Sequence, residues 1–289
     1  MRNTILSHNI KWWIGYGTLL GAARHKGFIP WDDDIDLIIM RNEYERFLKV
    51  AADEFKPPYY LPVRDRFGIQ LYNNSTTKLN SRYKKSFDAG KKLPVNHYGY
   101  IAIDIFPFDN IPDDENEWND LYNRLRSIAR SKTRVIYYQL LKYTDDYMPH
   151  VTPWKRPFSA ALHYALGIVN PFLGGVKRAL QKWERHTARK FDSMLKSLNY
   201  PEGRRVASYT LMYDRKFLSH HIWERSCFDE TVYLPFEMLT LPAPAGYEKI
   251  LDHCYGNWHE YVIRNYRHAD FFDTERPCTY YTQEGHMPE

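Results

Sequence analysis

The sequence predicts an α+β protein, with a small mixed β-sheet near the N-terminus, flanking helices and a mainly helical C-terminal half. Three observations predict this class. Apolar residues alternate over 10–16 and 98–106, as in strands with one buried face. They recur at helical spacing over 42–55 and 113–129. The 289 residues contain no internal repeat, low-complexity tract or long linker, so we expect a single domain.

The elements can be placed along the chain from these periods and from residues that begin or end them. Strands are predicted at 10–16, 35–40, 67–83 (a hairpin about Asn73-Asn74), 98–106 and 231–241 (a second hairpin). Helices are predicted at 19–25, 42–55, 113–129, most of 157–198 and 247–254. Thr18 is a natural N-cap for the first helix and Gly27 its C-terminal stop. Pro57-Pro58 ends the second helix, and Gly256 ends the last.

Charge and cysteine content narrow the class of protein. The net charge of +5 arises from 40 basic and 35 acidic residues, which is too mild for a nucleic-acid-binding surface. A mild positive charge of this kind is better suited to small anionic substrates. Three cysteines lie far apart, without zinc or disulfide spacing, and this favours a reducing compartment. The N-terminus lacks the apolar core of a signal peptide, so we expect a cytoplasmic protein.

The most apolar stretch, 157–175, is interrupted by His163, Asn170 and Pro171. It falls short of the roughly 20 apolar residues that a membrane-spanning helix needs. We therefore expect a buried helix and no transmembrane segment. An amphipathic helix on a bilayer is the alternative, which leaves open a peripheral contact with the inner face of the membrane.

Four aspartates occupy five positions, at Asp32, Asp33, Asp34 and Asp36. Two unit charges about 4 Å apart repel by roughly 4 kcal/mol at an effective dielectric near 20, so such a cluster calls for a cation or for protonation. Asp34 and Asp36 flank Ile35 and face the same side of a strand. A solvated turn is the plain alternative, but a buried strand follows at once. We predict that Asp34 and Asp36 bind Mg²⁺, with Mn²⁺ as the alternative metal.

A second pattern lies upstream, where Gly17-Thr18 separates a strand from a short helix. The free amides of such a helix start can bind a phosphate group, although a simple N-cap would look the same. Arg24 and Lys26 follow the helix and could neutralise a diphosphate, or else remain solvated. We predict Gly17, Thr18, Arg24 and Lys26 as donor-binding residues.

Asp104 stands within the apolar run Ile-Ala-Ile-Asp-Ile-Phe. Burial of a lone carboxylate costs several kcal/mol unless it is paired or bound to metal. A bond to a loop amide or an arginine would satisfy it, but a third carboxylate facing Asp34 and Asp36 explains it better. Asp34, Asp36 and Asp104 are therefore the predicted catalytic residues.

Two other metal sites can be excluded. Asp32, Asp34, Asp36 and Glu43 match four positions of a calcium loop, but Leu37 stands where that loop needs glycine. The histidines, including His220-His221, show no zinc-ligand spacing.

The residues so far described resemble the LicD/fukutin family of phosphotransferases. The resemblance lies in Gly17–Gly21 (GTLLG), Arg24–Asp36 (RHKGFIPWDDDID), Tyr44–Phe47, Ile103–Pro107, Asp109–Pro112 and Leu239–Gly256. It implies a nucleotidyltransferase-type fold and one LicD-like domain over 1–289. Its catalytic core would span 8–112, and 113–289 would complete the substrate groove.

The resemblance also implies a reaction. A phosphoalcohol such as phosphocholine, or glycerol or ribitol phosphate, would pass from a CDP-linked donor to a sugar hydroxyl of a surface glycan or lipid-linked glycan. Transfer of an NMP to a small-molecule hydroxyl would use the same three carboxylates and is the alternative. A metal-dependent glycosyltransferase would not need Gly17-Thr18. A binding module without catalysis would not need three carboxylates.

Overall fold

The computed structural model describes residues 7–61, 69–79, 98–140, parts of 182–196, 203–209, 215–261 and 271–276. The chain divides into two compact units. The first unit joins Met1–Asp113 to Tyr200–Glu289, and the second is Asp114–Asn199. The single-domain organisation inferred from the sequence stays a prediction.

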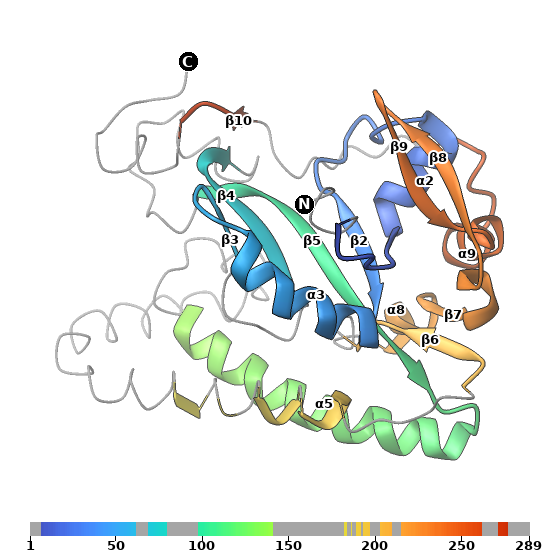
Figure 1. Ribbon diagram of the computed structural model, residues 1–289. Helices are drawn as coiled ribbons and strands as arrows, with labels where there is room; N and C mark the ends of the chain where they lie inside the picture. Colours follow the sequence, from blue (N-terminus) through green and yellow to red (C-terminus); the bar gives the residue numbers. More distant parts are fainter. Residues whose placement is uncertain are drawn as a thin grey trace, which may run out of the picture. The chain divides into compact units, whose positions relative to one another are not determined.

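The first unit is built on a mixed sheet (Figure 1). Its main path runs β1 (Trp13–Ile14), β2 (Asp36–Met40), β5 (Tyr98–Ile111), β4 (Ile69–Leu79) and β10 (Phe271–Asp273). The pairing of β2 with β5 is parallel, and the other pairings on this path are antiparallel. Strand β3 (Tyr59–Tyr60) pairs with β4, while β6 (Arg205–Ala207) joins the end of β5 to β7 (Ile222–Glu224). The predicted mixed sheet with helices is confirmed.

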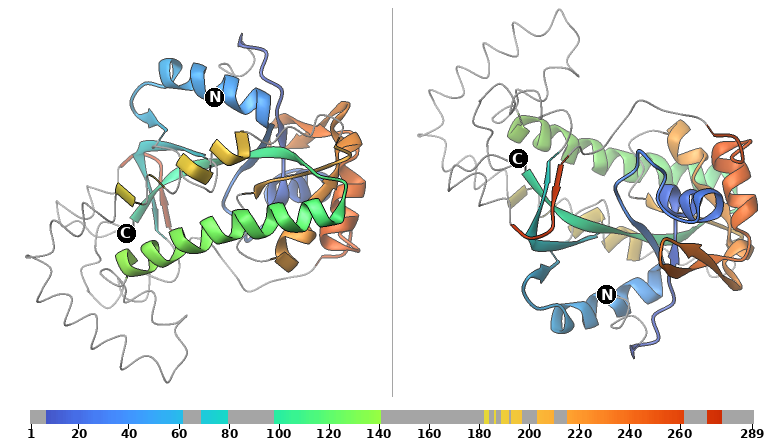
Figure 2. Two further views of the ribbon diagram at one scale, coloured as in Figure 1. Left: turned by 90° about the horizontal axis from the view of Figure 1, so that it is seen from below. Right: turned by 90° about the horizontal axis from the view of Figure 1, so that it is seen from above.

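Helices cover both faces of this sheet. Helix α3 (Arg41–Glu54) packs on one face and α2 (Tyr16–His25) on the other (Figure 2). One buried cluster joins α3 to the sheet through Tyr44, Phe47, Ala51, Ile39 and Ile105. The second cluster joins α2 to the sheet and to the C-terminal segments through Leu19, Ile38, Phe108, Trp223 and Leu251. Since β2 contributes to both clusters, the segment that enters β2 is held firmly from two sides.

The first helix differs from the prediction at both ends. It begins at Tyr16, with Gly15 at the N-cap, and not at residue 19. Thr18 caps nothing, because its hydroxyl accepts the N–H of Asp36 at 2.9 Å. At the C-terminal end the left-handed residue is Lys26, with φ 59°, and not Gly27. Thr18 and Gly27, which the sequence suggested as the start and stop signals of this helix, therefore make tertiary contacts instead.

Two predicted strands also differ. The strand expected over 10–16 is reduced to Trp13–Ile14, and both of its residues are buried. The hairpin expected about Asn73-Asn74 is one long strand, β4, with a register irregularity between Asn73 and Lys78. Residues 67–68 and 80–83 of that prediction lie outside the described chain. The register irregularity thus accommodates, within one strand, the polar residues that suggested a turn.

The C-terminal part of the first unit mixes strands and helices. Hairpin strands β8 (Thr231–Phe236) and β9 (Leu239–Pro244) confirm the second predicted hairpin. Helix α9 (Tyr247–Tyr255) ends at Gly256 with φ 65°, as predicted. Helix α8 (Arg215–Ser219) and the 3₁₀ helix η6 (Arg225–Phe228) complete it. The predicted mainly helical C-terminal half is therefore not confirmed, since strands and short helices alternate over the described residues 203–209 and 215–261.

The second unit contains the long helix α5 (Glu115–Leu140), which confirms the helix predicted from residue 113. Asp114 caps it, because its Oδ1 accepts the N–H groups of Asn116 and Glu117 at 3.0 and 2.9 Å. The apolar stretch 157–175 lies outside the described residues. Within the described ranges, no helix combines the length and apolar character needed to cross a bilayer.

A buried ion pair fixes the far ends of β2 and β5. Arg41 donates from Nε and from its NH2 group to the two carboxylate oxygens of Asp109, at 2.7 and 2.6 Å. Asp109 is 4% exposed. Burial lowers the pKa of Arg41, but the hydrogen bonds and the opposite charge of Asp109 outweigh it and hold that pKa above its ordinary value. We expect Asp109→Ala to lower the free energy of unfolding by about 3–5 kcal/mol, because it leaves a buried charge without its partner.

Chemical denaturation would measure this loss, with Asp113→Ala as the matched control. Asp113 pairs with Arg204 at 3.2 Å near the surface, where an ion pair contributes about 0–1 kcal/mol. Similar losses in the two variants would contradict the structural role assigned to Asp109.

Candidate functional site

The parallel pairing of β2 with β5 brings the three predicted carboxylates together. Asp36 and Asp104 are register partners on these neighbouring strands. Asp34 precedes β2. The residue between Asp34 and Asp36 is held against β5, because the carbonyl of Ile35 accepts the N–H of Asp104 at 2.8 Å. One carboxylate oxygen from each of Asp34, Asp36 and Asp104 lies within 4.8 Å of the others. The structure thus assembles the group that the sequence suggested.

Asp36 is the most buried member of this group, with 8% of its surface exposed. Its backbone is anchored on the N-terminal turn of α2, through Thr18 and through the Gly15 N–H, which donates to the Asp36 carbonyl at 3.0 Å. The Gly17 amide donates a hydrogen bond to the Asp36 side chain. The predicted anion site at this helix start therefore contains a carboxylate of the protein itself.

Burial raises the pKa of Asp36 well above its ordinary value, and repulsion from Asp34, Asp104 and Asp32 raises it further. The Gly17 hydrogen bond opposes this rise. A buried acid surrounded by like charges is the environment that a bound cation would relieve. Carboxylate oxygens are the ligands that Mg²⁺ and Mn²⁺ prefer, so the donor set fits a hard divalent cation.

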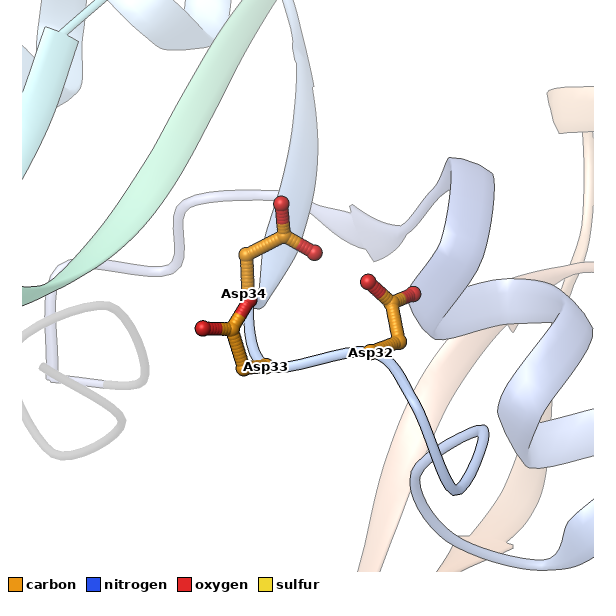
Figure 3. Close-up of side chains that lie close together, drawn as sticks. All are labelled: Asp32, Asp33 and Asp34. Atoms are coloured by element: carbon orange, nitrogen blue, oxygen red, sulfur yellow. The ribbon is translucent and has the colours of Figure 1, made fainter. Parts of the chain in front are cut away.

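A second acidic group shares Asp34 with the first. Oxygens of Asp32, Asp33 and Asp34 also lie within 4.8 Å of one another. Figure 3 shows the carboxylates of Asp32 and Asp34 turned toward each other, with Asp33 on the other side of Asp34. The Asp32 carboxylate lies against Gly17, where a Cβ atom would collide with it. Gly17 is therefore needed for close approach, which is a role that the sequence did not reveal.

The predicted donor-binding residues occupy different places on α2. Gly17 and Thr18 lie in its first turn, and Thr18 is only 3% exposed. Arg24 lies at the other end, roughly 10 Å away at 1.5 Å per residue. Its NH1 donates to the carbonyls of Trp258 and Glu260 at 3.0 and 2.9 Å. The exposed Lys26 follows it. Donor binding by all four residues stays a prediction.

Tyr16 is a part of the site that sequence analysis missed. It opens α2 with φ 45°, a value that non-glycine residues rarely adopt. Its ring packs edge-on against Phe106 at 5.0 Å and lies 5.4 Å from both His221 and Trp223. Burial, and then repulsion from Asp36, raise its pKa. Its place between two glycines, Gly15 and Gly17, was the available signal. This packing holds the residue before Gly17 in a strained conformation beside Asp36.

The two cysteines in the described part of the chain are consistent with a structural role. Cys227 and Cys254 are free thiols. Cys254 accepts the indole N–H of Trp223 at 3.1 Å and donates to the carbonyl of His220 at 3.0 Å. Burial raises the pKa of Cys254 to about 11, so its thiol is protonated and unreactive at neutral pH.

The chain is similar in sequence to several known proteins. The chain is 35% identical over 127 residues to the lipopolysaccharide cholinephosphotransferase LicD of Haemophilus influenzae, which covers 44% of each chain. It is 32% identical over 122 residues to an uncharacterised protein of Rickettsia typhi, covering 37% of this chain and 39% of that one. A Rickettsia prowazekii protein, also uncharacterised, is 30% identical over 136 residues, covering 40% and 51%. The chain thus spans about half or less of each relative.

The matched segment carries the site. Residues 9–142 match the family model described as LicD/FKTN/FKRP, nucleotidyltransferase domain. This range includes α2, β2 and β5, and with them Asp34, Asp36 and Asp104. The segment that builds the acidic group, residues 9–142, is therefore similar to the LicD/FKTN/FKRP nucleotidyltransferase domain.

Proposed function

We propose that this protein is a divalent-metal-dependent phosphotransferase that moves a phosphoalcohol from a CDP-linked donor to a sugar hydroxyl of a glycan. The observation that carries the proposal is the Asp34–Asp36–Asp104 group, assembled across β2 and β5 within the matched domain. The printed name of the Haemophilus relative favours phosphocholine as the group transferred and lipopolysaccharide as the acceptor. Glycerol and ribitol phosphates are the other phosphoalcohols to test.

Asp34 and Asp36 are the proposed ligands of Mg²⁺ or Mn²⁺. When bound, such an ion would offset negative charge on the donor diphosphate and on the departing CMP. Asp34 and Asp36 are held for this task by different means. Asp36 is fixed by the first turn of α2, while Asp34 lies on the loop that enters β2. The Gly17 hydrogen bond thus opposes the rise in the pKa of Asp36 that burial and the neighbouring carboxylates cause.

Asp104 is the proposed general base. It lies on β5 opposite Asp36, partly exposed, and its backbone N–H is bound to the Ile35 carbonyl. A carboxylate oxygen of Asp104 would accept the proton of the attacking sugar hydroxyl as the new phosphorus–oxygen bond forms. The acceptor hydroxyl would thereby become a better nucleophile, and the bond to CMP would break.

The products of the reaction test the proposal. Purified protein is mixed with Mg²⁺, a labelled glycan acceptor and CDP-choline, CDP-glycerol or CDP-ribitol in turn. We expect CMP release together with a gain of the phosphoalcohol by the acceptor, for one donor above the others. Reactions in chelator are the control and should show neither product. Transfer to the acceptor without metal would contradict the proposal.

A nucleotidyl transfer is the second candidate, because the matched family model is described as a nucleotidyltransferase domain. The same carboxylates would then attach an NMP to a small-molecule hydroxyl, and pyrophosphate would be released. Pyrophosphate formation from a nucleoside triphosphate and a small-molecule alcohol, with no CMP from any CDP donor, would establish this candidate in place of the first.

We also propose a cytoplasmic location, with the acceptor reached at the inner face of the membrane. This follows from the predicted reducing compartment and from a lipid-linked acceptor. Fractionation of cells that express the protein would test it, since a peripheral protein is released from membranes by salt.

A further inference from the structure

The loop that carries the aspartates is fastened by a distant part of the chain. We call residues 26–35, between α2 and β2, the aspartate loop; it has no regular secondary structure. The β8–β9 hairpin lies beside α2 in the first unit (Figure 1). Its residues fall outside the segment 9–142 that matches the family model. The contacts between the two therefore link the acidic site to a region that the family match does not cover.

Glu237, at the tip of the hairpin, both donates a hydrogen bond to the aspartate loop and accepts one from it. Its backbone N–H donates to the carbonyl of Lys26 at 2.7 Å. Its carboxylate accepts the N–H of Phe28 at 3.1 Å, a charge-assisted bond. Gly27 lies between these two bonds, and a Cβ atom there would collide with the Glu237 side chain. The neighbouring residue Phe236 adds an edge-on ring contact with Phe28 at 4.8 Å.

The fastening extends to the acidic cluster. Within the aspartate loop, the Asp32 N–H donates to the carbonyl of Ile29 at 2.8 Å and so closes a turn. The Asp32 carboxylate then rests against Gly17 of α2. The loop is thus held at its start by Glu237 and at Asp32 by α2. Loss of the first attachment would free the segment between them and, with it, the approach to Asp34.

The conformation of Glu237 has an energetic cost. Phe236 and Leu239 are register partners, so Glu237 and Met238 form a two-residue hairpin turn. Glu237 has φ 53°, and a turn of this kind normally takes glycine at its first central position. The left-handed conformation costs a residue with a side chain roughly 1–2 kcal/mol. Glycine would be the more stable choice for the hairpin alone, so the carboxylate must serve something outside it.

We propose that Glu237 is a positioning residue that sets the aspartate loop, and through it Asp32 and Asp34, for metal and donor binding. It touches no reacting atom. Its effect on turnover rests on the function proposed above, whereas its effect on the loop does not.

The test separates positioning from stability by means of Glu237→Gly. This variant removes the carboxylate and also relieves the strained turn, so the melting temperature should stay equal or rise. Amide hydrogen exchange of residues 26–34 should nevertheless become faster. Turnover should fall by about 10- to 100-fold, the scale of a small misplacement of catalytic groups. Glu237→Gln keeps an oxygen that can accept from Phe28 and should recover most of the turnover.

The control is Glu230→Ala, an exposed glutamate just before β8, which should change neither exchange nor turnover. Gly27→Ala supplies a second line of evidence. It should slow turnover in the wild-type background, where the new methyl group meets Glu237, but cost little more when added to Glu237→Gly. Additive effects would overturn the proposed contact.

Two further results would overturn the proposal. One is unchanged hydrogen exchange over residues 26–34 in Glu237→Gly. The other is a loss in Glu237→Gln as large as that in the glycine variant. Hydrogen exchange needs no substrate, so it tests Glu237 even if no CDP donor is turned over, and that failure would count against the proposed function alone.

Discussion

Asp36→Asn should reduce turnover by about 10³-fold, the upper range for loss of a group that stabilises charge in the transition state. The amide keeps the shape of the side chain and can still accept the Gly17 hydrogen bond, but it binds a divalent cation weakly. Steady-state turnover with the preferred CDP donor and calorimetric titration with Mg²⁺ would measure both losses. Near-normal turnover would exclude Asp36 as a ligand.

The same variant should be more stable than wild type when metal is chelated. An unfolded aspartate has a pKa of about 3.9, whereas burial and neighbouring carboxylates raise that of folded Asp36. Between these two values the folded state binds more protons, so the free energy of unfolding falls as the pH rises. Asp36→Asn removes this contribution. In chelator, its melting temperature should exceed that of wild type at pH values above the pKa of folded Asp36. The two melting temperatures should converge near pH 4.

Asp33→Asn is the matched control, since Asp33 is a neighbouring carboxylate in the loop before β2 that does not belong to the Asp34–Asp36–Asp104 group (Figure 3). It should affect turnover and Mg²⁺ affinity far less than Asp36→Asn does. If the two variants behave alike, the response reflects the total charge of the cluster and not a specific ligand.

Asp104→Asn should lower turnover by about 10² or more, the usual scale for loss of a general base. The substitution preserves the shape of the side chain and the backbone bond to Ile35, so the fold should be unaffected. Mg²⁺ and donor binding should change little. Since Asp104 also repels Asp36, the pH at which Mg²⁺ binding sets in should move downward.

Asp53→Asn, at an exposed carboxylate of α3, is the control for this variant. A loss of Mg²⁺ binding in Asp104→Asn, with the pH dependence of turnover retained at high metal concentration, would make Asp104 a ligand and place the base elsewhere. Normal turnover and normal binding would leave Asp104 with a structural role only.

Local patterns were sufficient for much of the core. Residues 42–54 repeat apolar side chains at helical spacing, and α3 buries Tyr44, Phe47 and Ala51 as that spacing requires. The isoleucines around Asp104 alternate as in a strand, and β5 runs through them and continues to Ile111. Asp34 and Asp36 could be assigned to one site from their spacing, because side chains two apart on a strand face the same side. These conclusions depend only on residues close in sequence.

Long-range contacts decided the rest. Thr18 could cap a helix, but the Asp36 N–H competes for its hydroxyl, and that contact spans 18 residues. Gly27 looked like a helix stop, although its small size is needed by Glu237, more than 200 residues later. Asp104 became part of the acidic site only through the parallel pairing of β2 with β5. Propensity and periodicity specify which residues can form a strand, a helix or a ligand pair. Which distant groups meet is settled by packing and hydrogen bonding in the folded chain, and these energies have no counterpart in a local pattern.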